Sequence, residues 1–589
     1  MNNRFLLFIF FGFVLLTFIF TFPLFLKFGT HVSGTVHTSE LFFTIWAGWQ
    51  ERFAFLNHID LNNYHFISYP FSTIVSSVVV FPVGYSIIKW FSILTNEIIM
   101  YNLIITLSFV LSGLFAFILA RYLTKNLWAA FFTGLIFAFC PYHFSKSCQY
   151  LGLSEIQWLP LYIYSLIRLK DEPGIKGMVL LSAVLFMFSE NYFHVYLVLI
   201  ATLLFVIVSL LQKDYSRKVS FVKFLILAAV VVFLLTLPTT YGIYRAYLFS
   251  PSRADSLLFY RPFQDLFSQS ARPLSYFLPS ITNPLLGGIT GMFLGSNLYG
   301  INFSEHTLYL GWTAIIISLF VLLKLKRRQA NIAEHFYIRY FAWLAVTAWF
   351  FSQPPWWNWF GLRIFMPSFF MYKILPMFRV YARFGVLVML AVSVLAGFGL
   401  KFILGYFKSK KIRFLIFTVC CGLIMLEFWN YPPFRIIDIS QPPEVYVWLK
   451  QQPSDIVIAE YPLYLKDARV EDWLYQTKHH KRIINGAHPG SYAYKVAKSI
   501  EKLSALNSAR TLKWLGVKYV IVHRGYYQQT GLVDQIDELQ MIAKNPGLKL
   551  IKVFPAQECP ANVLCIKKTG PIDVYEVQGP PVEPHLSSS

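Results

Sequence analysis

Charged residues are scarce in this 589-residue chain. Only 14% of its residues are Asp, Glu, Lys or Arg, against about 25% in an ordinary soluble domain, and 56% are hydrophobic. A soluble chain of this length would fold into several domains with charged surfaces throughout. Apolar stretches of about twenty residues, long enough to cross ~30 Å of hydrocarbon, recur instead up to about residue 430. The composition therefore excludes an ordinary soluble protein and predicts a polytopic α-helical membrane protein.

The common short motifs for nucleotide binding and for hydrolysis are absent. The sequence contains no Walker loop, no dinucleotide-binding glycine motif, no HExxH motif and no serine-hydrolase elbow. The six cysteines show no metal-ligand spacing. Cys559 and Cys565 form a small disulfide loop in an oxidising compartment, or two reduced thiols otherwise. No site for ATP or a nucleotide sugar is predicted.

Eleven transmembrane helices are predicted. Met1–Lys27 has Arg4 in front and no small-residue cleavage site behind it, so we expect a retained first helix rather than a removed signal peptide. A further apolar stretch, Val75–Trp90, either spans the membrane or lies in its interface. The ten other predicted spans are 100–120, 127–144, 155–168, 177–191, 194–212, 221–240, 306–323, 338–352, 384–402 and 412–430.

The net charge of +22 is concentrated in alternate connections between these spans. With Arg4, those connections hold 20 Lys and Arg against 4 Asp and Glu; the rest of residues 1–430 holds 12 against 10, and the remainder of the chain 19 against 15. Basic loops face the cytoplasm. The N-terminus is therefore expected in the cytoplasm of a multi-pass plasma-membrane protein, and residues after 430 outside it. This placement argues against nucleic acid as a partner, the other usual reading of a basic chain.

The predicted fold class is thus a polytopic α-helical membrane domain, residues 1–430, followed by a soluble extracytoplasmic α/β domain, residues 431–578. The membrane domain has two long outer loops, 28–99 and 241–305. A Pro- and Ser-rich tail, 579–589, is expected to be flexible. In the α/β domain the expected strands include Ile456–Glu460 and Val517–His523, and the expected helices include Val496–Ala509 and Val533–Lys544.

Several ionisable side chains on the outer side are candidate site residues. Glu40 precedes an aromatic amphipathic helix at the membrane surface, where a carboxylate can act as a general base; alternatively it is a first-turn helix acid beside the cap Ser39. Glu190 and His194 either face a cavity or pair with each other one helical turn apart. Further candidates are His37, Trp46, Trp49, Glu305 and His306.

Arginines on the same side are candidates for binding a phosphate, since the guanidinium suits bidentate phosphate recognition. Arg379 and Arg383 are four residues apart and are expected on one helix face. Snorkelling to the interface is the alternative for these two residues. Pairing with lipid headgroups or with neighbouring aspartates is the alternative for the arginines of the second outer loop. The second outer loop contributes Arg253, Arg261 and Arg272.

These features together resemble the GT-C superfamily of polytopic glycosyltransferases, in a bacterial branch with a C-terminal extracytoplasmic domain. In that superfamily an acidic residue of the first outer loop precedes tryptophans six and nine positions on, as Glu40 precedes Trp46 and Trp49; the usual acid is Asp, so Glu is a departure. The resemblance extends to 101–121, 134–141, 158–160, 305–312, 378–384, 443–449, 485–486 and 515–519.

The resemblance implies a GT-C fold and a glycosyltransferase whose donor is a sugar on a polyprenyl phosphate. Glu40 would deprotonate an acceptor hydroxyl, which displaces the lipid phosphate with inversion, while arginines neutralise the leaving phosphate. The acceptor is a glycan, a lipid or a protein. No cofactor is certain, and a divalent metal, Mg²⁺ or Mn²⁺, stays open. A transporter or flippase for a glycolipid or polysaccharide precursor, or a scaffold without catalysis, are the alternative functions.

Overall fold

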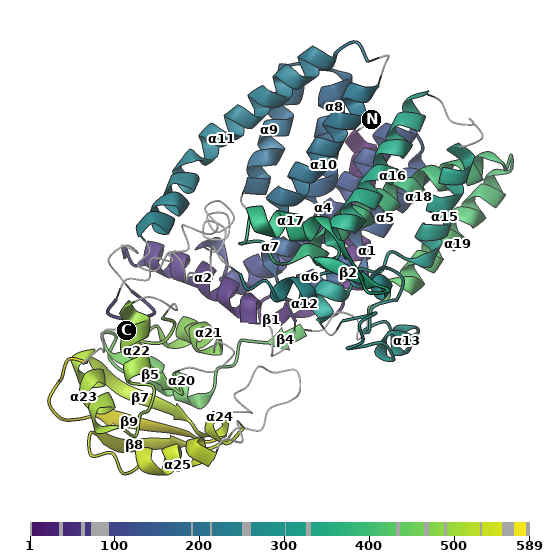
Figure 1. Ribbon diagram of the computed structural model, residues 1–589. Helices are drawn as coiled ribbons and strands as arrows, with labels where there is room; N and C mark the ends of the chain where they lie inside the picture. Colours follow the sequence, from purple (N-terminus) through teal and green to yellow (C-terminus); the bar gives the residue numbers. More distant parts are fainter. Residues whose placement is uncertain are drawn as a thin grey trace. The chain divides into compact units, whose positions relative to one another are not determined.

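Helices make up most of the computed structural model (Figure 1). It describes residues 3–34, 39–59, 65–71, 93–189, 192–212, 215–249, 261–300, 302–325, 332–430, 436–463, 470–487, 492–529, 533–556 and 570–584. The chain divides into two compact units: Met1–Leu26 with Leu103–Tyr241 and Leu257–Arg435, and Lys27–Asn102 with Gly242–Ser256 and Ile436–Ser589. Several sequence predictions lie outside the described residues, namely His37, Glu190, Arg253, Val75–Trp90, Cys559 and Cys565.

The first unit is built around α18 (Gly385–Gly405), which is buried over most of its length and packs against α5 (Leu127–Ala138), α15 (Trp312–Leu325) and α16 (Ile332–Ser352). Small residues allow this close packing. A Cβ atom on Gly399 would lie 2.4 Å from the Ile317 carbonyl oxygen, and one on Gly397 would lie 2.2 Å from the Thr133 hydroxyl. Thr133 Oγ1 also donates to the Ser393 carbonyl oxygen at 3.1 Å, which ties α5 to α18.

Four stretches of the described chain are long and apolar enough to cross a membrane: Glu97–Thr124, His194–Leu211, Lys218–Pro238 and Tyr381–Gly405. A bent pair of helices is a fifth candidate. Other predicted spans coincide with shorter helices, such as α8 (Trp158–Asp171) and α9 (Ile175–Ser189), of 14 and 15 residues. The chain is therefore rich in apolar membrane helices, while the count of eleven stays a prediction.

The bent pair consists of α5 and α6 (Pro141–Ser147), whose axes differ by 41°. Asn126 caps the start of α5 by accepting a hydrogen bond from the Ala129 N–H. Pro141 is the first residue of α6, where its missing N–H costs nothing because that N–H would have no helical partner. The break turns the chain so that α6 is buried along its whole length.

The remaining elements of the first unit include a hairpin and several short helices. The hairpin is a two-stranded antiparallel sheet of β2 (Trp356–Trp359) and β3 (Leu362–Phe365). The other elements are α1 (Asn3–Phe20), α4 (Glu97–Thr124, from Leu103), α7 (Leu151–Ser154), α10 (Tyr192–Leu211), α11 (Lys218–Phe249, up to Tyr241), α12 (Asp265–Ser268), η3 (Pro273–Tyr276), α13 (Gly287–Gly291), α14 (Phe303–His306), α17 (Pro367–Ile374), η4 (Tyr381–Phe384) and α19 (Lys410–Glu427).

The second unit contains a five-stranded sheet in the order β6-β5-β7-β9-β8. Neighbouring β6, β5 and β7 are parallel, whereas β9 is antiparallel to both β7 and β8 (Figure 1). The strands are β5 (Val457–Tyr461), β6 (Arg482–Ile483), β7 (Val517–His523), β8 (Leu548–Phe554) and β9 (Ile572–Val577), and the helices between them are α20 (Glu444–Lys450, before β5), α21 (Val470–His479), α22 (Tyr492–Ser499), α23 (Leu506–Trp514), α24 (Arg524–Gln529) and α25 (Val533–Ile542).

The strands expected at 456–460 and 517–523 and the helix expected at 533–544 are confirmed. The single helix expected at 496–509 is wrong. The chain forms α22 and α23 instead, separated by residues 500–505, because Ile500 and Leu503 turn inward to join the buried core of the sheet.

The first outer loop belongs to the same unit as the C-terminal region. Its β1 (His31–Ser33) pairs antiparallel with β4 (Ile436–Asp438), and its α2 (Ser39–Leu56) packs along α21. Asn102 adds two hydrogen bonds, from its amide nitrogen to the carbonyl oxygens of Phe28 and His31, at 2.8 and 2.7 Å. The described segments of this loop, residues 28–34 and 39–59, are thus parts of a folded unit.

Candidate functional site

A buried carboxylate in the first unit binds two cations. Glu305 Oε2 lies 2.7 Å from Lys146 Nζ, and Glu305 Oε1 accepts a hydrogen bond from Arg383 Nη2 at 3.2 Å. The side chains of Glu305, Lys146 and Arg383 are 3%, 0% and 9% exposed. Buried charges are rare unless paired, and such clusters mark functional sites more often than surface pairs do.

Three separate elements, α6, α14 and η4, bring these side chains together, and η4 carries Arg383. Lys146 lies on α6, which the break after α5 directs into the interior. Glu305 lies on the single turn α14, which Asn302 caps by accepting a hydrogen bond from the Glu305 N–H at 3.2 Å. Lys146 Nζ also donates to the carbonyl and hydroxyl oxygens of Ser304, at 2.7 and 3.0 Å, so it fixes the position of α14.

The electrostatics of Glu305 follow from these contacts. Burial acts to raise the pKa of its carboxyl, but Lys146 and Arg383 outweigh burial and hold that pKa at about 2. Glu305 is therefore ionised at neutral pH. Two formal positive charges face one negative charge, which leaves the cluster with a net charge of +1 in a dry interior.

Two polar side chains beside this cluster have no hydrogen-bond partner among the described residues. His194 of α10 is fully buried, both of its ring nitrogens lack a partner, and it interacts electrostatically with Arg383 and Lys146. The Tyr142 hydroxyl of α6 is also buried and without a partner, and it interacts with Glu305 and Arg383. Leaving such groups unsatisfied is costly, so this arrangement is suited to receiving a polar or anionic group.

The prediction that Arg379 and Arg383 lie on one helix face is wrong. Residues 377–380 are not helical, and the chain enters η4 only at Tyr381. The two guanidinium groups therefore turn to different carboxylates: Arg379 Nη1 binds Asp265 Oδ2 at 2.5 Å in a half-exposed pair, whereas Arg383 is buried against Glu305. Arg379 thus pairs with a loop aspartate, an alternative that the sequence offers for the loop arginines rather than for Arg379.

Three other predicted site residues, Arg261, Arg272 and His306, belong to the same unit. Arg272 donates to the Phe267 carbonyl oxygen at 2.6 Å, and it interacts electrostatically with His306. His306 is buried, with Nδ1 accepting from the Asn302 N–H and Nε2 lying 3.1 Å from the Ser270 carbonyl oxygen. These contacts hold the loop to itself. Arg261 is tied by its backbone, whose carbonyl oxygen accepts from the Tyr372 hydroxyl.

Sequence analysis missed Lys146 and Tyr142. The signal for Lys146 was present, because a lysine two residues after the predicted span 127–144 is expensive to bury and so needs a partner. Tyr142 carried no such signal, since a buried tyrosine without a hydrogen-bond partner resembles any aromatic core residue in sequence.

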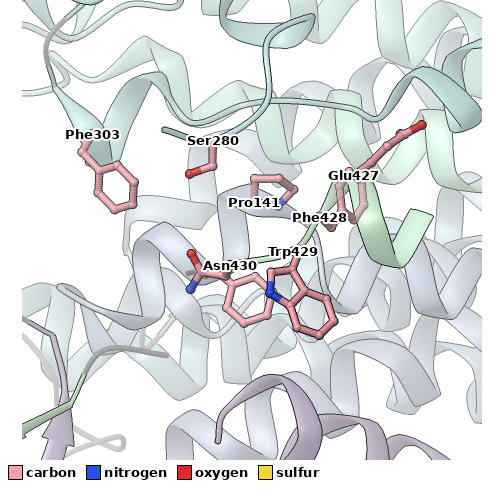
Figure 2. A pocket seen from close by; sticks show the side chains of 8 residues that line it. Pro141, Ser280, Phe303, Glu427, Phe428, Trp429 and Asn430 are labelled. Carbon is pink, nitrogen blue, oxygen red and sulfur yellow. The ribbon is translucent and has the colours of Figure 1, made fainter. Parts of the chain in front are cut away.

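A pocket of about 10 Å³, with room for about one water molecule, adjoins the elements that carry the cluster (Figure 2). Pro141 and Phe144 of α6, Phe303 of α14 and Trp429 line it. Figure 2 shows the Glu427 carboxylate directed away from the other labelled side chains, and it accepts hydrogen bonds from Thr313. Ligand pockets usually enclose ~300–1,000 Å³, so this pocket, at about 10 Å³, does not hold a lipid-linked sugar without widening. The other lining residues are Ser280, Phe428 and Asn430.

The second unit holds the other group of predicted site residues. Glu40 is exposed in the first turn of α2. Trp46 and Trp49 are buried instead: Trp46 Nε1 donates to Gln476 Oε1 at 2.7 Å, and the Trp49 ring stacks on His480 with centroids 5.5 Å apart. The two tryptophans therefore anchor α2 on α21 and fix the helix that presents Glu40.

No group of three or more His, Cys, Asp or Glu side chains arranged to hold a metal ion occurs within the part of the chain that the structure describes. His37 and Glu190 lie outside that part, so metal binding by the predicted residues stays an open prediction.

No family model and no curated protein sequence matches this chain. Solved structures that share its fold include AftD and ArnT. Arabinofuranosyltransferase AftD from Mycobacteria superposes with a TM-score of 0.59 at 12% identity, over 98% of this chain and 40% of AftD. ArnT from Cupriavidus metallidurans, solved bound to undecaprenyl phosphate, superposes with a TM-score of 0.50 at 12% identity, over 96% of this chain and 97% of ArnT. This chain thus spans less than half the length of AftD. The chain thus shares the overall fold of AftD and ArnT, and its long apolar helices are those of a membrane protein.

Proposed function

We propose that this protein is a membrane glycosyltransferase that moves a sugar from a polyprenyl-phosphate donor to an acceptor hydroxyl outside the cytoplasm, with inversion. The observation that carries the proposal is the buried +1 cluster of Lys146, Arg383 and Glu305, with the unsatisfied groups of Tyr142 and His194 beside it. The likeness to ArnT, solved with undecaprenyl phosphate, supports a lipid-phosphate donor.

The cluster suits a departing lipid phosphate. Breaking the bond between sugar and phosphate leaves negative charge on the phosphate, and a preorganised cation in a dry site stabilises that charge without reorganising solvent. Arg383 and Lys146 supply the charge. The Tyr142 hydroxyl and a His194 ring nitrogen would supply neutral donors to the phosphate oxygens, which would satisfy the groups that now lack partners.

The acceptor hydroxyl needs a general base, and Glu305 is badly suited to that task. Its carboxylate already binds two cations, which hold its pKa at about 2 and make it a weak proton acceptor. Glu40, exposed at the start of α2, remains our candidate for the base. It would take the proton of the hydroxyl as that oxygen attacks the anomeric carbon and the phosphate leaves.

Tyr142→Phe tests the phosphate site without disturbing the fold. Because the Tyr142 hydroxyl has no partner among the described residues, removing it should leave the unfolding midpoint unchanged or slightly raised. Binding of undecaprenyl phosphate to the purified full chain, followed by native mass spectrometry, should weaken about tenfold to a hundredfold, as expected for the loss of one hydrogen bond to a charged group. His194→Phe should weaken binding similarly.

Tyr276→Phe is the matched control, because the buried Tyr276 hydroxyl donates to Ser352 Oγ at 2.7 Å. That variant should lose stability and keep its affinity for undecaprenyl phosphate. Unchanged affinity in both Tyr142→Phe and His194→Phe would contradict the assignment of the phosphate to this cluster. Glu40→Gln should bind the lipid normally and transfer no sugar; full transfer by that variant would contradict its role as the base.

A further inference from the structure

The hairpin β2–β3 exposes an aromatic residue at a strained position. Trp359 pairs with Leu362, so Phe360 and Gly361 form a two-residue turn. Both have positive φ, 47° and 84°, as a type I′ turn requires, and Asn-Gly is the sequence that suits such a turn. A bulky aromatic residue is rarely found at positive φ. Phe360 is nevertheless placed there with its side chain 95% exposed.

The exposed apolar surface continues along the hairpin and onto α17. All four residues of β3 are exposed, among them Leu362 and Phe365. On α17, Phe370 and Ile374 are exposed as well. Scattered exposed apolar residues are ordinary, but a run of large ones over two successive elements marks a surface that is covered in the working protein.

Aromatic contacts make the hairpin and α17 one body. The Phe365 and Phe369 ring centroids lie 4.7 Å apart, and the Trp356 ring lies 6.3 Å from that of Phe369. Met366 N–H, at the junction, donates to the Pro355 carbonyl oxygen at 2.9 Å. The exposed side chains are thus displayed on a packed support rather than on a loose segment.

Two cations flank this surface. The Arg363 guanidinium lies 5.2 Å from the Trp356 ring, and the Lys373 ammonium lies 4.4 Å from the Phe369 ring. Both residues are exposed. Large apolar side chains with tryptophans and basic groups beside them are typical of segments that lie in the interfacial region of a bilayer, where the cations meet anionic headgroups.

The position in the chain agrees with that environment. The apolar stretch Tyr381–Gly405, long enough to span a membrane, begins seven residues after α17 ends at Ile374. An element so close to the end of a span lies near the membrane boundary. We infer that residues 356–374, the β2–β3 hairpin with α17, form an anchor that inserts the side chains of Phe360, Leu362 and Phe370 into the headgroup–acyl boundary of an anionic phospholipid bilayer.

This inference does not depend on the proposed transferase activity, and spin labelling of the full chain tests it. A nitroxide would be placed at Phe360→Cys, in a variant whose native cysteines are replaced by serine, in vesicles of phosphatidylcholine and phosphatidylglycerol. Collision rates with oxygen, which enriches in lipid, and with the water-soluble complex Ni(II)-EDDA report the depth of the label. Lys549→Cys, exposed on β8, is the aqueous control, and Val230→Cys, exposed on α11, is the lipid control.

The oxygen-to-nickel collision ratio at Phe360→Cys should exceed that at Lys549→Cys at least about fivefold and approach that at Val230→Cys. In a second variant, Phe360→Asn, the new residue is favoured in the turn but is too polar to enter the lipid. A label at Phe370→Cys in that variant should therefore lie less deep in the bilayer. A ratio at residue 360 equal to the aqueous control would overturn the inference. Low collision rates with both reagents would also overturn it, because protein would then cover this surface.

Discussion

Removing the Glu305 carboxylate would leave Lys146 and Arg383 buried without a counter-charge. Glu305→Gln keeps the shape of the side chain and deletes its charge. Breaking one partner of a buried ion pair typically costs 3–5 kcal/mol, because the remaining charge is uncompensated. Here a single substitution strands two cations, with side chains 0% and 9% exposed. We therefore expect Glu305→Gln to lower the free energy of unfolding by about 3–5 kcal/mol.

The pH dependence gives an independent magnitude for the same group. The pKa of Glu305 is held at about 2, against an ordinary value of 4.5. Since the folded-state pKa is depressed, the ionised carboxylate contributes stability that is fully present above pH 4.5 and is lost as the pH falls toward 2. The difference between the two pKa values corresponds to about 3 kcal/mol. The cost of breaking the buried pair and the cost of protonating Glu305 are therefore of the same order of magnitude.

The assay is unfolding of the purified full chain in detergent, followed by tryptophan fluorescence, as a function of SDS at pH 7 and of temperature between pH 7 and pH 3. The Glu305→Gln variant should unfold at lower SDS and should lose the part of the pH dependence below 4.5. Asp265→Asn is the matched control, since its half-exposed pair with Arg379 should be worth at most about 1 kcal/mol. Adding Lys146→Met to Glu305→Gln should restore part of the loss. Equal stability of Glu305→Gln and the parent, or no recovery in the double variant, would refute the reasoning.

Two further predictions concern packing in each unit. Trp46→Phe should lower the free energy of unfolding by about 1–2 kcal/mol more than Trp49→Phe, because only Trp46 donates to buried Gln476, at 2.7 Å. Equal losses of stability in SDS titrations of the two variants would show that this hydrogen bond contributes nothing. Gly134→Ala should destabilise the first unit by about 1–3 kcal/mol, since a Cβ atom there would lie 2.6 Å from the Gly113 carbonyl oxygen. Gly12→Ala, whose Cβ would meet nothing within 4 Å, is its control and should be neutral or stabilising; similar unfolding midpoints for the two variants would contradict the close approach of α4 and α5.

Local elements were predictable where their signal was local. The strand at 517–523 is an uninterrupted run rich in β-branched residues, and the structure has it with the same bounds. The membrane character followed from composition alone. The interruption at residues 500–505 was not predictable from the helical pattern around it, because it depends on Ile500 and Leu503 packing into a core whose other members come from distant strands.

The candidate site was only partly predictable for the same reason. The sequence singled out Glu305 and Arg383 as charged groups in an apolar chain, but nothing in their spacing of 78 residues indicates that they bind each other. Lys146 joins them only because α5 and α6 are bent by 41°. The resemblance singles out the two tryptophans after Glu40 as site candidates. Their burial against α21 instead gives them a packing role, which no local pattern reveals.

Turnover of a polyprenyl-phosphate sugar is the activity that we propose for this protein, and it can be measured with the purified chain. Purified full-length chain in phospholipid vesicles would be given undecaprenyl-phosphate-linked sugars together with an extract of envelope glycans as acceptors, and free undecaprenyl phosphate would be measured by mass spectrometry. We predict release that depends on the acceptor extract and disappears in Glu40→Gln. If no donor is cleaved while a labelled donor lipid crosses the vesicle bilayer, the protein is a transporter and the proposed transferase activity is wrong.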